Sequence, residues 1–379
     1  MDLAVVAVNV GRTAATVAGI VLVLGIFWEA FETIVLPRTV SRRLRFTTLF
    51  YEVVWRVGYR LVRILRNHNS KREYALSVLG PLSLILLIAS WSIAIIFGYA
   101  LLQLGLNAPL SGGDADFGQR LYFSAATFFT VGYGDVVATA GAGKLLSVVE
   151  AGMGFGMFAL VISYFPVLYQ AFSARERVSL LLDARAGSPP VAAELLETYA
   201  DDLEGLRELF VEFERWGASL LETYLSYPIL TVYRSQHEEL SWIASTTCIC
   251  DACALVQVAY LGDSKEMNRL QRQSKLTYAM LRHLVVDIAY VIDEDPVTSP
   301  DERLTLEGWI RISSLLTKAG APVCLGQESC DRLTEMRADY EPYLLGLANG
   351  LFLTVPPWMR LEHQLASWET TAWDDGKHF

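Results

Sequence analysis

The amino-acid sequence predicts an all-α protein with a membrane-spanning first half and a soluble helical second half. Of its 379 residues 53% are hydrophobic, and the mean hydropathy of +0.33 exceeds that of an ordinary soluble protein. Charge is divided unevenly, with 13 basic and 9 acidic residues up to Phe172 but 18 basic and 32 acidic residues from Ser173 onward. Because so acidic a second half would repel phosphates, we expect no nucleic-acid partner.

Residues 16–36 are predicted to form a first transmembrane helix, with residues 1–15 as an extracellular N-terminus. About twenty mostly apolar residues are enough for a helix to cross roughly 30 Å of hydrocarbon, and Pro37 ends the run. Glu29 and Glu32 share one face of this helix by their three-residue spacing. Two interpretations of these carboxylates stay open: counter-charges for the arginines that follow, or acidic groups close to the membrane interface.

Residues 41–72 are predicted to form an amphipathic helix that lies on the inner leaflet. Apolar and charged side chains separate onto opposite faces, and the charged face carries Glu52, Arg56, Arg60 and Arg63. Ten basic residues against two acidic ones between Pro37 and Tyr74 place this segment inside the cell by the positive-inside rule, so the N-terminus is expected outside. The alternative is a voltage sensor formed by Arg56, Arg60 and Arg63, although a sensor needs a bundle of helices and only one span precedes these residues.

Two further transmembrane helices are expected, with a short apolar segment between them. Residues 82–104 can cross the membrane after a bend at Gly80-Pro81, and residues 145–172 can cross it again. Between them, residues 117–129 form a helix of only about 20 Å, which is too short to cross. Such a segment can enter the membrane part-way and return, an arrangement that is tolerated where protein buries it.

The loop after this short helix has the backbone chemistry of a cation site. Its sequence is Thr130-Val131-Gly132-Tyr133-Gly134-Asp135. A dehydrated cation needs a ring of oxygens, and main-chain carbonyls supply one if successive carbonyls point the same way. Glycine reaches the necessary dihedrals cheaply, so we expect Gly132 and Gly134 to provide them. The side chains of Val131 and Tyr133 would then pack behind the loop, with the Thr130 hydroxyl adding one oxygen and Asp135 at the outer mouth.

This hexapeptide resembles the selectivity signature of the potassium channel family, which it matches at every position. The resemblance implies a potassium-channel pore over residues 82–172, with an outer helix, a re-entrant pore helix at 117–129, a filter at 130–135 and an inner helix at 145–172. It also implies no cofactor and K⁺ as the permeant ion, bound by the backbone carbonyls of Thr130, Val131, Gly132 and Tyr133. One filter copy supplies only a quarter of the ring, so we expect a homotetramer in the lipid bilayer.

Two positions near the filter depart from the family pattern. Many relatives carry a second threonine where this chain has Phe129, and some carry a glutamate where it has Ala126. Because Ala126 cannot pair with Asp135, the filter needs another support, and we expect the Tyr122 hydroxyl to reach Asp135. Tyr122 and Phe129 are therefore the predicted filter-support residues.

The inner helix contains the predicted gating residues. Gly154 falls at the spacing of the family's hinge glycine. Pro166 removes a backbone donor and is expected to add a kink near the inner mouth. The alternative is that Gly154 and the glycines beside it only let helices approach closely.

The second half is predicted to be an all-helical cytoplasmic domain over residues 191–379, joined to the pore by a linker at 173–190. No run of residues after Phe172 is expected to be long enough to span a membrane. Apolar residues recur at three- and four-residue steps in the segments 203–224, 237–260, 265–292 and 300–318. A capping box is expected at Ser299-Pro300-Asp301-Glu302. No G-x-G-x-x-G follows a strand pattern, which excludes the commonest dinucleotide-binding design.

Three closely spaced cysteines, Cys248, Cys250 and Cys253, are the candidate metal ligands of this half. Thiolates suit a soft metal, but a complete structural site of this kind needs a fourth ligand. The helical pattern around the cysteines and the missing fourth ligand favour small buried core residues instead.

The leading functional hypothesis is passive K⁺ conduction through a homotetrameric pore that the inner helix gates. One alternative is a membrane receptor that senses a ligand or partner and in which the helical domain is primary. The other is an ion-coupled transporter subunit, but transporter relatives of this pore keep several degraded filter copies where this chain has one intact copy. An enzyme is not expected, because the sequence shows no nucleophile-base arrangement, P-loop or metalloprotease motif.

Overall fold

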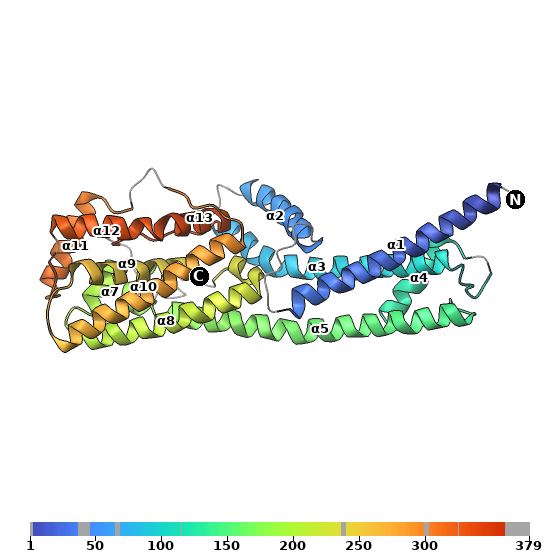
Figure 1. The fold of residues 1–379 in the computed structure, drawn as a ribbon, viewed down its shortest axis with the longest axis horizontal. Helices are drawn as coiled ribbons and strands as arrows, with labels where there is room; N and C mark the ends of the chain where they lie inside the picture. The colour runs from blue at the N-terminus through green and yellow to red at the C-terminus, as the bar shows by residue number, and fades with distance from the viewer. Residues whose placement is uncertain are drawn as a thin grey trace. The chain divides into compact units, whose positions relative to one another are not determined.

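The computed structural model of the protein describes residues 3–36, 46–64, 69–113, 115–235, 240–298, 303–324 and 326–360. The regular structure of these residues is helical apart from three isolated backbone bridges, so the all-α prediction is confirmed. The chain divides into two compact units, Met1–Tyr169 and Gln170–Phe379 (Figure 1). Following the expectation from the sequence, we call the first the membrane unit and the second the soluble unit.

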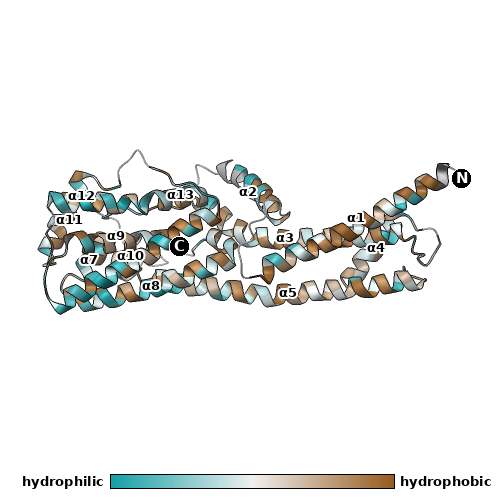
Figure 2. Ribbon diagram, in the orientation of Figure 1, coloured by the Kyte–Doolittle hydropathy of each residue, from teal (hydrophilic) through white to brown (hydrophobic). Residues whose placement is uncertain are grey.

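The membrane unit contains four helices and most of a fifth. They are α1 (Leu3–Ile34), α2 (Phe46–Ile64), α3 (Asn69–Gly105), α4 (Phe117–Phe128) and α5 (Gly141–Leu180), and the last of these continues into the soluble unit. Helices α1, α3 and α5 are long and apolar enough to cross a membrane. Their apolar residues appear as brown segments along each ribbon (Figure 2). Helix α4, with 12 residues, is too short to cross.

Two helix boundaries differ from those expected from the sequence. Helix α3 begins at Asn69 and continues through Pro81, so the predicted outer helix at 82–104 is the second part of a longer helix. Helix α2 is shorter than the predicted amphipathic segment, whose last residues belong to α3. A proline inside a helix removes one backbone hydrogen bond without ending the helix, which is why Pro81 did not mark a boundary.

Small residues bring α1 and α3 into close contact. A Cβ atom added to Gly19 would lie 2.7 Å from the carbonyl oxygen of Gly98, and one added to Gly105 would lie 2.1 Å from the Thr16 hydroxyl. Close backbone approach is the usual basis of helix association in lipid, where burial of apolar surface offers little gain. Around this contact the unit buries an apolar cluster that includes Trp91, Tyr99, Phe128 and Met157.

The soluble unit is a bundle of helices around one buried central helix. Its elements after α5 are α6 (Asp183–Ala186), α7 (Ala192–Thr198), α8 (Leu203–Ser226), the 3-10 helix η1 (Pro228–Val232), α9 (Trp242–Ala259), α10 (Lys265–Val291), α11 (Leu306–Lys318), α12 (Gln327–Ala338) and α13 (Glu341–Leu351). Helix α9 contacts α7, α8, α10, α12 and α13 (Figure 1). It is therefore the core of this unit.

Helix α9 corrects the expectation that no segment after Phe172 could span a membrane. Its 18 residues are long and apolar enough to do so, yet 94% of that segment is buried inside the unit. A helix that is apolar on all sides suits either a membrane or the centre of a large core, and composition does not distinguish the two. The packing of the neighbouring helices assigns α9 to the core.

Residues 173–190, expected to be a linker, are largely helical and packed. Helix α5 extends to Leu180, and Asp183–Ala186 forms α6. Helix α11 also begins differently, because its first turn is capped by Thr305, whose hydroxyl accepts a hydrogen bond from the Gly308 amide at 3.1 Å. The capping box predicted at residues 299–302 lies outside the described residues.

Candidate functional site

The loop between α4 and α5 has an alternating backbone conformation. Positive φ angles occur at every second residue, at Thr130 (53°), Gly132 (69°) and Gly134 (77°). Alternation of left- and right-handed residues lines up successive peptide groups, so that they form a concave row of like groups. Glycine accepts this conformation readily, whereas Thr130 holds it at a cost of about 1 kcal/mol or more. Strain of this kind persists only where the surrounding structure enforces it.

The inner end of the loop is tied to the last turn of α4. The amides of Phe129, Thr130 and Val131 donate to carbonyl oxygens of Ala125, Thr127 and Ala126 at 2.8 to 3.0 Å. The Phe129 ring lies 5.3 Å from the ring of Phe128 and 6.1 Å from that of Phe158, centroid to centroid. The main chain of the loop therefore starts from a fixed position at the C-terminal end of α4, where the helix dipole is negative.

The outer end of the loop is held by side chains. The Tyr122 hydroxyl donates to Asp135 Oδ2 at 2.9 Å, which is the contact expected from the sequence. Ser111 binds the same end, because its hydroxyl accepts from the Val137 amide at 3.0 Å. Sequence reasoning missed Ser111, which lies in the preceding loop and carries no recognisable motif.

The side chains in the middle of the loop are largely exposed in the single chain. Tyr133 is 77% exposed and Val131 is 46% exposed, although both were expected to pack behind the loop. A Cβ atom at Gly132 or Gly134 would meet nothing within 4 Å. The described residues of one chain thus fix the two ends of the loop and leave both of its faces open.

Gly154 lies where α5 touches the end of α4. A Cβ atom at this position would fall 2.0 Å from the Phe128 carbonyl oxygen, so no side chain fits. The close-approach interpretation of Gly154 is therefore confirmed, and its role as a hinge stays a prediction. Helix α5 runs without a break through both Gly154 and Pro166.

Three buried polar residues lie on α4 or against it: Arg120 and Ser124 belong to α4, and Glu150 belongs to α5. The Arg120 guanidinium is 5% exposed, and its Nη1 donates to the carbonyl oxygens of Gln103 at 2.9 Å and Ala108 at 2.8 Å. Ser124 and Glu150 are fully buried, and their hydroxyl and carboxyl groups are in contact. Sequence reasoning missed all three. A charged residue in an apolar membrane segment is itself a signal of a functional or structural role, and Arg120 and Glu150 both met that description.

Glu29 makes a contact that neither of the two interpretations from the sequence included. Its carboxylate accepts hydrogen bonds from the Phe46 amide at 3.2 Å, the Thr47 amide at 3.4 Å and the Thr47 hydroxyl at 2.7 Å. It therefore caps the first turn of α2, where a negative charge is favoured by the helix dipole. Glu32 accepts a hydrogen bond from the Trp28 indole at 2.5 Å.

The arginines of α2 retain an open role. Arg56 forms an exposed ion pair with Glu52 at 3.8 Å, and Arg60 is also exposed. The side chain of Arg63 lies outside the described residues. Voltage sensing by Arg56, Arg60 and Arg63 stays a prediction.

In the soluble unit the C-terminal end of α5 is anchored by Arg175. This side chain is 4% exposed, and its guanidinium donates to the Tyr224 hydroxyl at 3.0 Å, the Leu230 carbonyl at 3.1 Å and the Tyr233 carbonyl at 2.9 Å. It also lies 4.8 Å from the centre of the Phe172 ring. The sequence indicated Arg175 only as a basic residue beyond a membrane span, because its partners come from distant parts of the chain.

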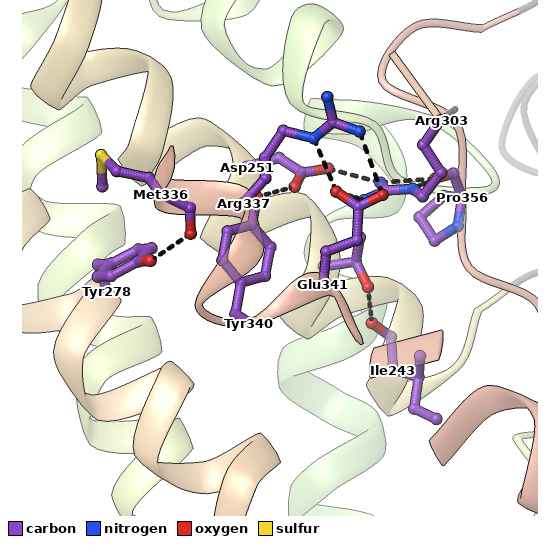
Figure 3. Close-up of polar contacts among 10 residues, drawn as sticks. Ile243, Asp251, Tyr278, Arg303, Met336, Arg337, Tyr340, Glu341 and Pro356 are labelled. Atoms are coloured by element: carbon purple, nitrogen blue, oxygen red, sulfur yellow. Dashed lines mark hydrogen bonds and ion pairs between the residues drawn. The ribbon is translucent and has the colours of Figure 1, made fainter. Parts of the chain in front are cut away.

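A second buried network joins α9 to α13 and to the segment before α11 (Figure 3). Arg303 binds Asp251 at 2.7 Å and lies 3.5 Å from Glu341, and Arg337 binds Glu341 at 2.7 Å. The Tyr340 hydroxyl donates to the other Asp251 oxygen. Burial beside the Asp251 carboxylate raises the pKa of Tyr340 well above its ordinary value, so this phenol stays protonated as a donor.

The three clustered cysteines lie inside α9. Cys248, Cys250 and Cys253 are all fully buried, as the core interpretation expected. Burial raises the pKa of each thiol well above its ordinary value. Because a soft metal binds the thiolate, these surroundings disfavour the metal interpretation.

Comparison with known proteins finds a similarity to an ion-channel family model, almost all of it within the membrane unit. Residues 84–170 match the family model described as ion channel. The uncharacterized membrane protein YdjJ of Bacillus subtilis (strain 168) is 27% identical over 186 residues, which cover 47% of this chain and 54% of that protein. The chain thus spans about half the length of this curated relative. No solved structure matches.

Proposed function

We propose, from the ion-channel domain at residues 84–170, that this protein is a potassium-selective channel that conducts K⁺ passively through a homotetrameric pore. The observation that carries the proposal is the alternation of positive φ angles at Thr130, Gly132 and Gly134. This conformation would present the carbonyl oxygens of Thr130, Val131, Gly132 and Tyr133 as a row that replaces the hydration shell of the ion. K⁺ would be the permeant ion, and the conduction needs no cofactor.

Assembly of four chains follows from the open faces of the loop. One loop supplies one row of oxygens, whereas a dehydrated ion must be surrounded. Neighbouring copies around a four-fold axis would complete the ring with one face of the loop and cover the exposed Val131 and Tyr133 side chains on the other. Four copies of α4 would also direct their negative ends toward the inner end of the filter, which favours a cation there.

Gating would involve α5, because this helix reaches from the filter region into the soluble unit. Its 40 residues form one helix from Gly141 to Leu180. The Arg175 hydrogen bonds fix its last turns to the fold of the soluble unit. A rearrangement of that unit would therefore move the inner helix directly. By the distribution of basic residues, the N-terminus would lie outside and the soluble unit in the cytoplasm.

The proposal is tested by ion flux into liposomes that contain the purified full chain. We expect uptake of K⁺ over Na⁺ and its loss in Gly132→Asp, because this change puts a side chain and a negative charge beside the row of carbonyls. Gly25→Ala is the matched control, since a Cβ atom there meets nothing within 4 Å. A wild-type protein that assembles but shows no selective flux would contradict the proposal and would favour the receptor alternative.

A further inference from the structure

We propose that Glu150 is a positioning residue for the filter loop, and that its side chain acts as a neutral carboxylic acid that hydrogen-bonds Ser124 and holds α4 against α5. This inference rests on the proposed function, because its consequence concerns ion selectivity. Neither residue belongs to the loop itself. Both are fully buried in the membrane unit.

The two helices meet along a short seam with matching spacing. Glu150 and Gly154 are one turn apart on α5, and Ser124 and Phe128 are one turn apart on α4. At one end of the seam the carboxyl of Glu150 contacts the hydroxyl of Ser124. At the other end Gly154 leaves room for the Phe128 carbonyl, which a Cβ atom would approach to 2.0 Å. The seam therefore combines one polar contact with one close backbone approach.

A neutral Glu150 lets the Ser124 hydroxyl make both of its contacts at once. The Ser124 hydroxyl has a single hydrogen, and the Ile96 carbonyl oxygen at 2.8 Å can only accept one. If that hydrogen serves Ile96, the contact between Ser124 and Glu150 needs a second hydrogen, and only a protonated carboxyl supplies it. Tyr99, the titratable neighbour of Glu150, directs its own hydroxyl to the Met153 sulfur at 2.8 Å.

The surroundings of the carboxyl agree with the neutral form. Its other oxygen, Oε2, is buried and has no hydrogen-bond partner among the described residues. No arginine or lysine of that part of the chain forms an ion pair with it. An ionised carboxylate held among neutral groups pays a large desolvation cost, which protonation removes.

The seam lies directly before the filter. Thr130, the first filter residue, follows Phe128 by two positions, and its amide is hydrogen-bonded to α4 at Thr127. A change in the distance between α4 and α5 therefore moves the start of the loop. Because carbonyl oxygens select an ion by their positions, even a small displacement should lower selectivity before it prevents assembly.

The test compares Glu150→Gln, Glu150→Leu and Ser124→Ala with the wild-type full chain in liposomes. We expect the K⁺-to-Na⁺ flux ratio to fall about fivefold in Glu150→Leu and Ser124→Ala, as the loss of one hydrogen bond predicts. Glu150→Gln should stay within about twofold of wild type, because its amide N–H replaces the acid as donor. The double variant Glu150→Leu with Ser124→Ala should be no worse than either single variant. Chemical cross-linking reports the oligomeric state of each variant.

The possible outcomes separate this inference from the proposed function. A wild-type chain without selectivity contradicts the channel proposal itself. A selective wild type whose Glu150→Leu variant assembles and is equally selective contradicts only the role of Glu150. Loss of selectivity in Glu150→Gln equal to that in Glu150→Leu would also overturn the inference, because it would show that the negative charge is what matters. If Glu150→Leu fails to assemble, Ser124→Ala decides, since it removes the same contact by a smaller change.

Discussion

The ionisable side chains of the membrane unit and the network around Asp251 and Glu341 in the soluble unit bind different kinds of partner. In the membrane unit Arg120 binds backbone carbonyls, Glu29 binds backbone amides and Glu150 contacts a hydroxyl. In the soluble unit Asp251 and Glu341 are paired with arginines. The first arrangement satisfies main-chain groups that the ends of helices and the loops beside them leave without partners. The second joins separate helices through opposite charges.

The difference indicates what each set of contacts does. Arg120, bound to main-chain carbonyls, fixes the path of the backbone beside α4, which leads into the loop at residues 130–135. Paired charges mainly fix the relative positions of α9, α13 and the segment before α11 in the soluble unit. Substitutions that remove one member of each arrangement should therefore differ in how strongly they lower stability or flux. The following experiments measure that difference.

The largest effect is expected for Arg303→Met. Removing the guanidinium leaves Asp251 buried without its counter-charge, which typically costs about 3–5 kcal/mol of unfolding free energy. Chemical denaturation of the full chain in detergent, followed by tryptophan fluorescence, measures the loss. Arg269→Met on the exposed face of α10 serves as the control and should change the stability little. A loss below about 1 kcal/mol for Arg303→Met would contradict the comparison.

Alkaline pH should produce the next largest effect through Tyr224. Burial raises the pKa of Tyr224 to about 12, although the nearby Arg175 guanidinium by itself would lower this pKa. The unfolded chain releases this proton near pH 10, so between pH 10 and 12 the unfolding free energy falls by about 1.4 kcal/mol per pH unit for this group.

Tyr224→Phe should therefore flatten the decline of stability in that pH interval. Unfolding free energies of the variant and wild type at pH 9, 10 and 11 give the two slopes. Tyr290→Phe is the matched control, because Tyr290 is 88% exposed. Equal slopes in all three proteins would show that Tyr224 is not held protonated by the fold.

A smaller effect is expected for Arg120→Met in the membrane unit. This change removes the donor of the Ala108 carbonyl, whereas the Gln103 carbonyl keeps its bond from the Ala108 amide at 3.0 Å. An unsatisfied carbonyl costs about 1–3 kcal/mol, less than an uncompensated charge. Thermal unfolding in the same detergent tests whether Arg120→Met lowers stability less than Arg303→Met does. Lys144→Met, at an exposed site, is the control. A loss for Arg120→Met larger than that for Arg303→Met would reverse the comparison.

The smallest effect is expected for Tyr122→Phe at the outer end of the loop. The variant keeps the ring and loses one hydrogen bond to Asp135, worth about 1 kcal/mol. We expect proper assembly with flux that declines about fivefold faster during sustained recording, because the outer end of the filter is less well held. An unchanged time course would show that the Ser111 contacts are sufficient at this end.

Much of the membrane unit was predictable because its signals are local. Hydropathy located the three long helices, and the length of residues 117–129 excluded a crossing. The contact between Tyr122 and Asp135 was also expected, since a short helix and the loop directly after it leave few possible arrangements. Contacts between residues distant in sequence could not be predicted in this way. The pairs formed by Arg175 with Tyr224 and by Arg303 with Asp251 join positions about 50 residues apart, for which one sequence carries no signal.

The sequence by itself determined the all-helical class, the apolar spans and the glycine pattern of the loop at residues 130–135, because each depends on the properties of neighbouring residues along one segment. Only the tertiary structure decided that α9 is a core helix, that residues 173–190 are packed and that Glu29 caps α2. These features depend on which distant groups come close enough to exclude water or to donate a hydrogen bond. A buried polar side chain can be recognised in a sequence, but its partner is chosen by the packing of the helices.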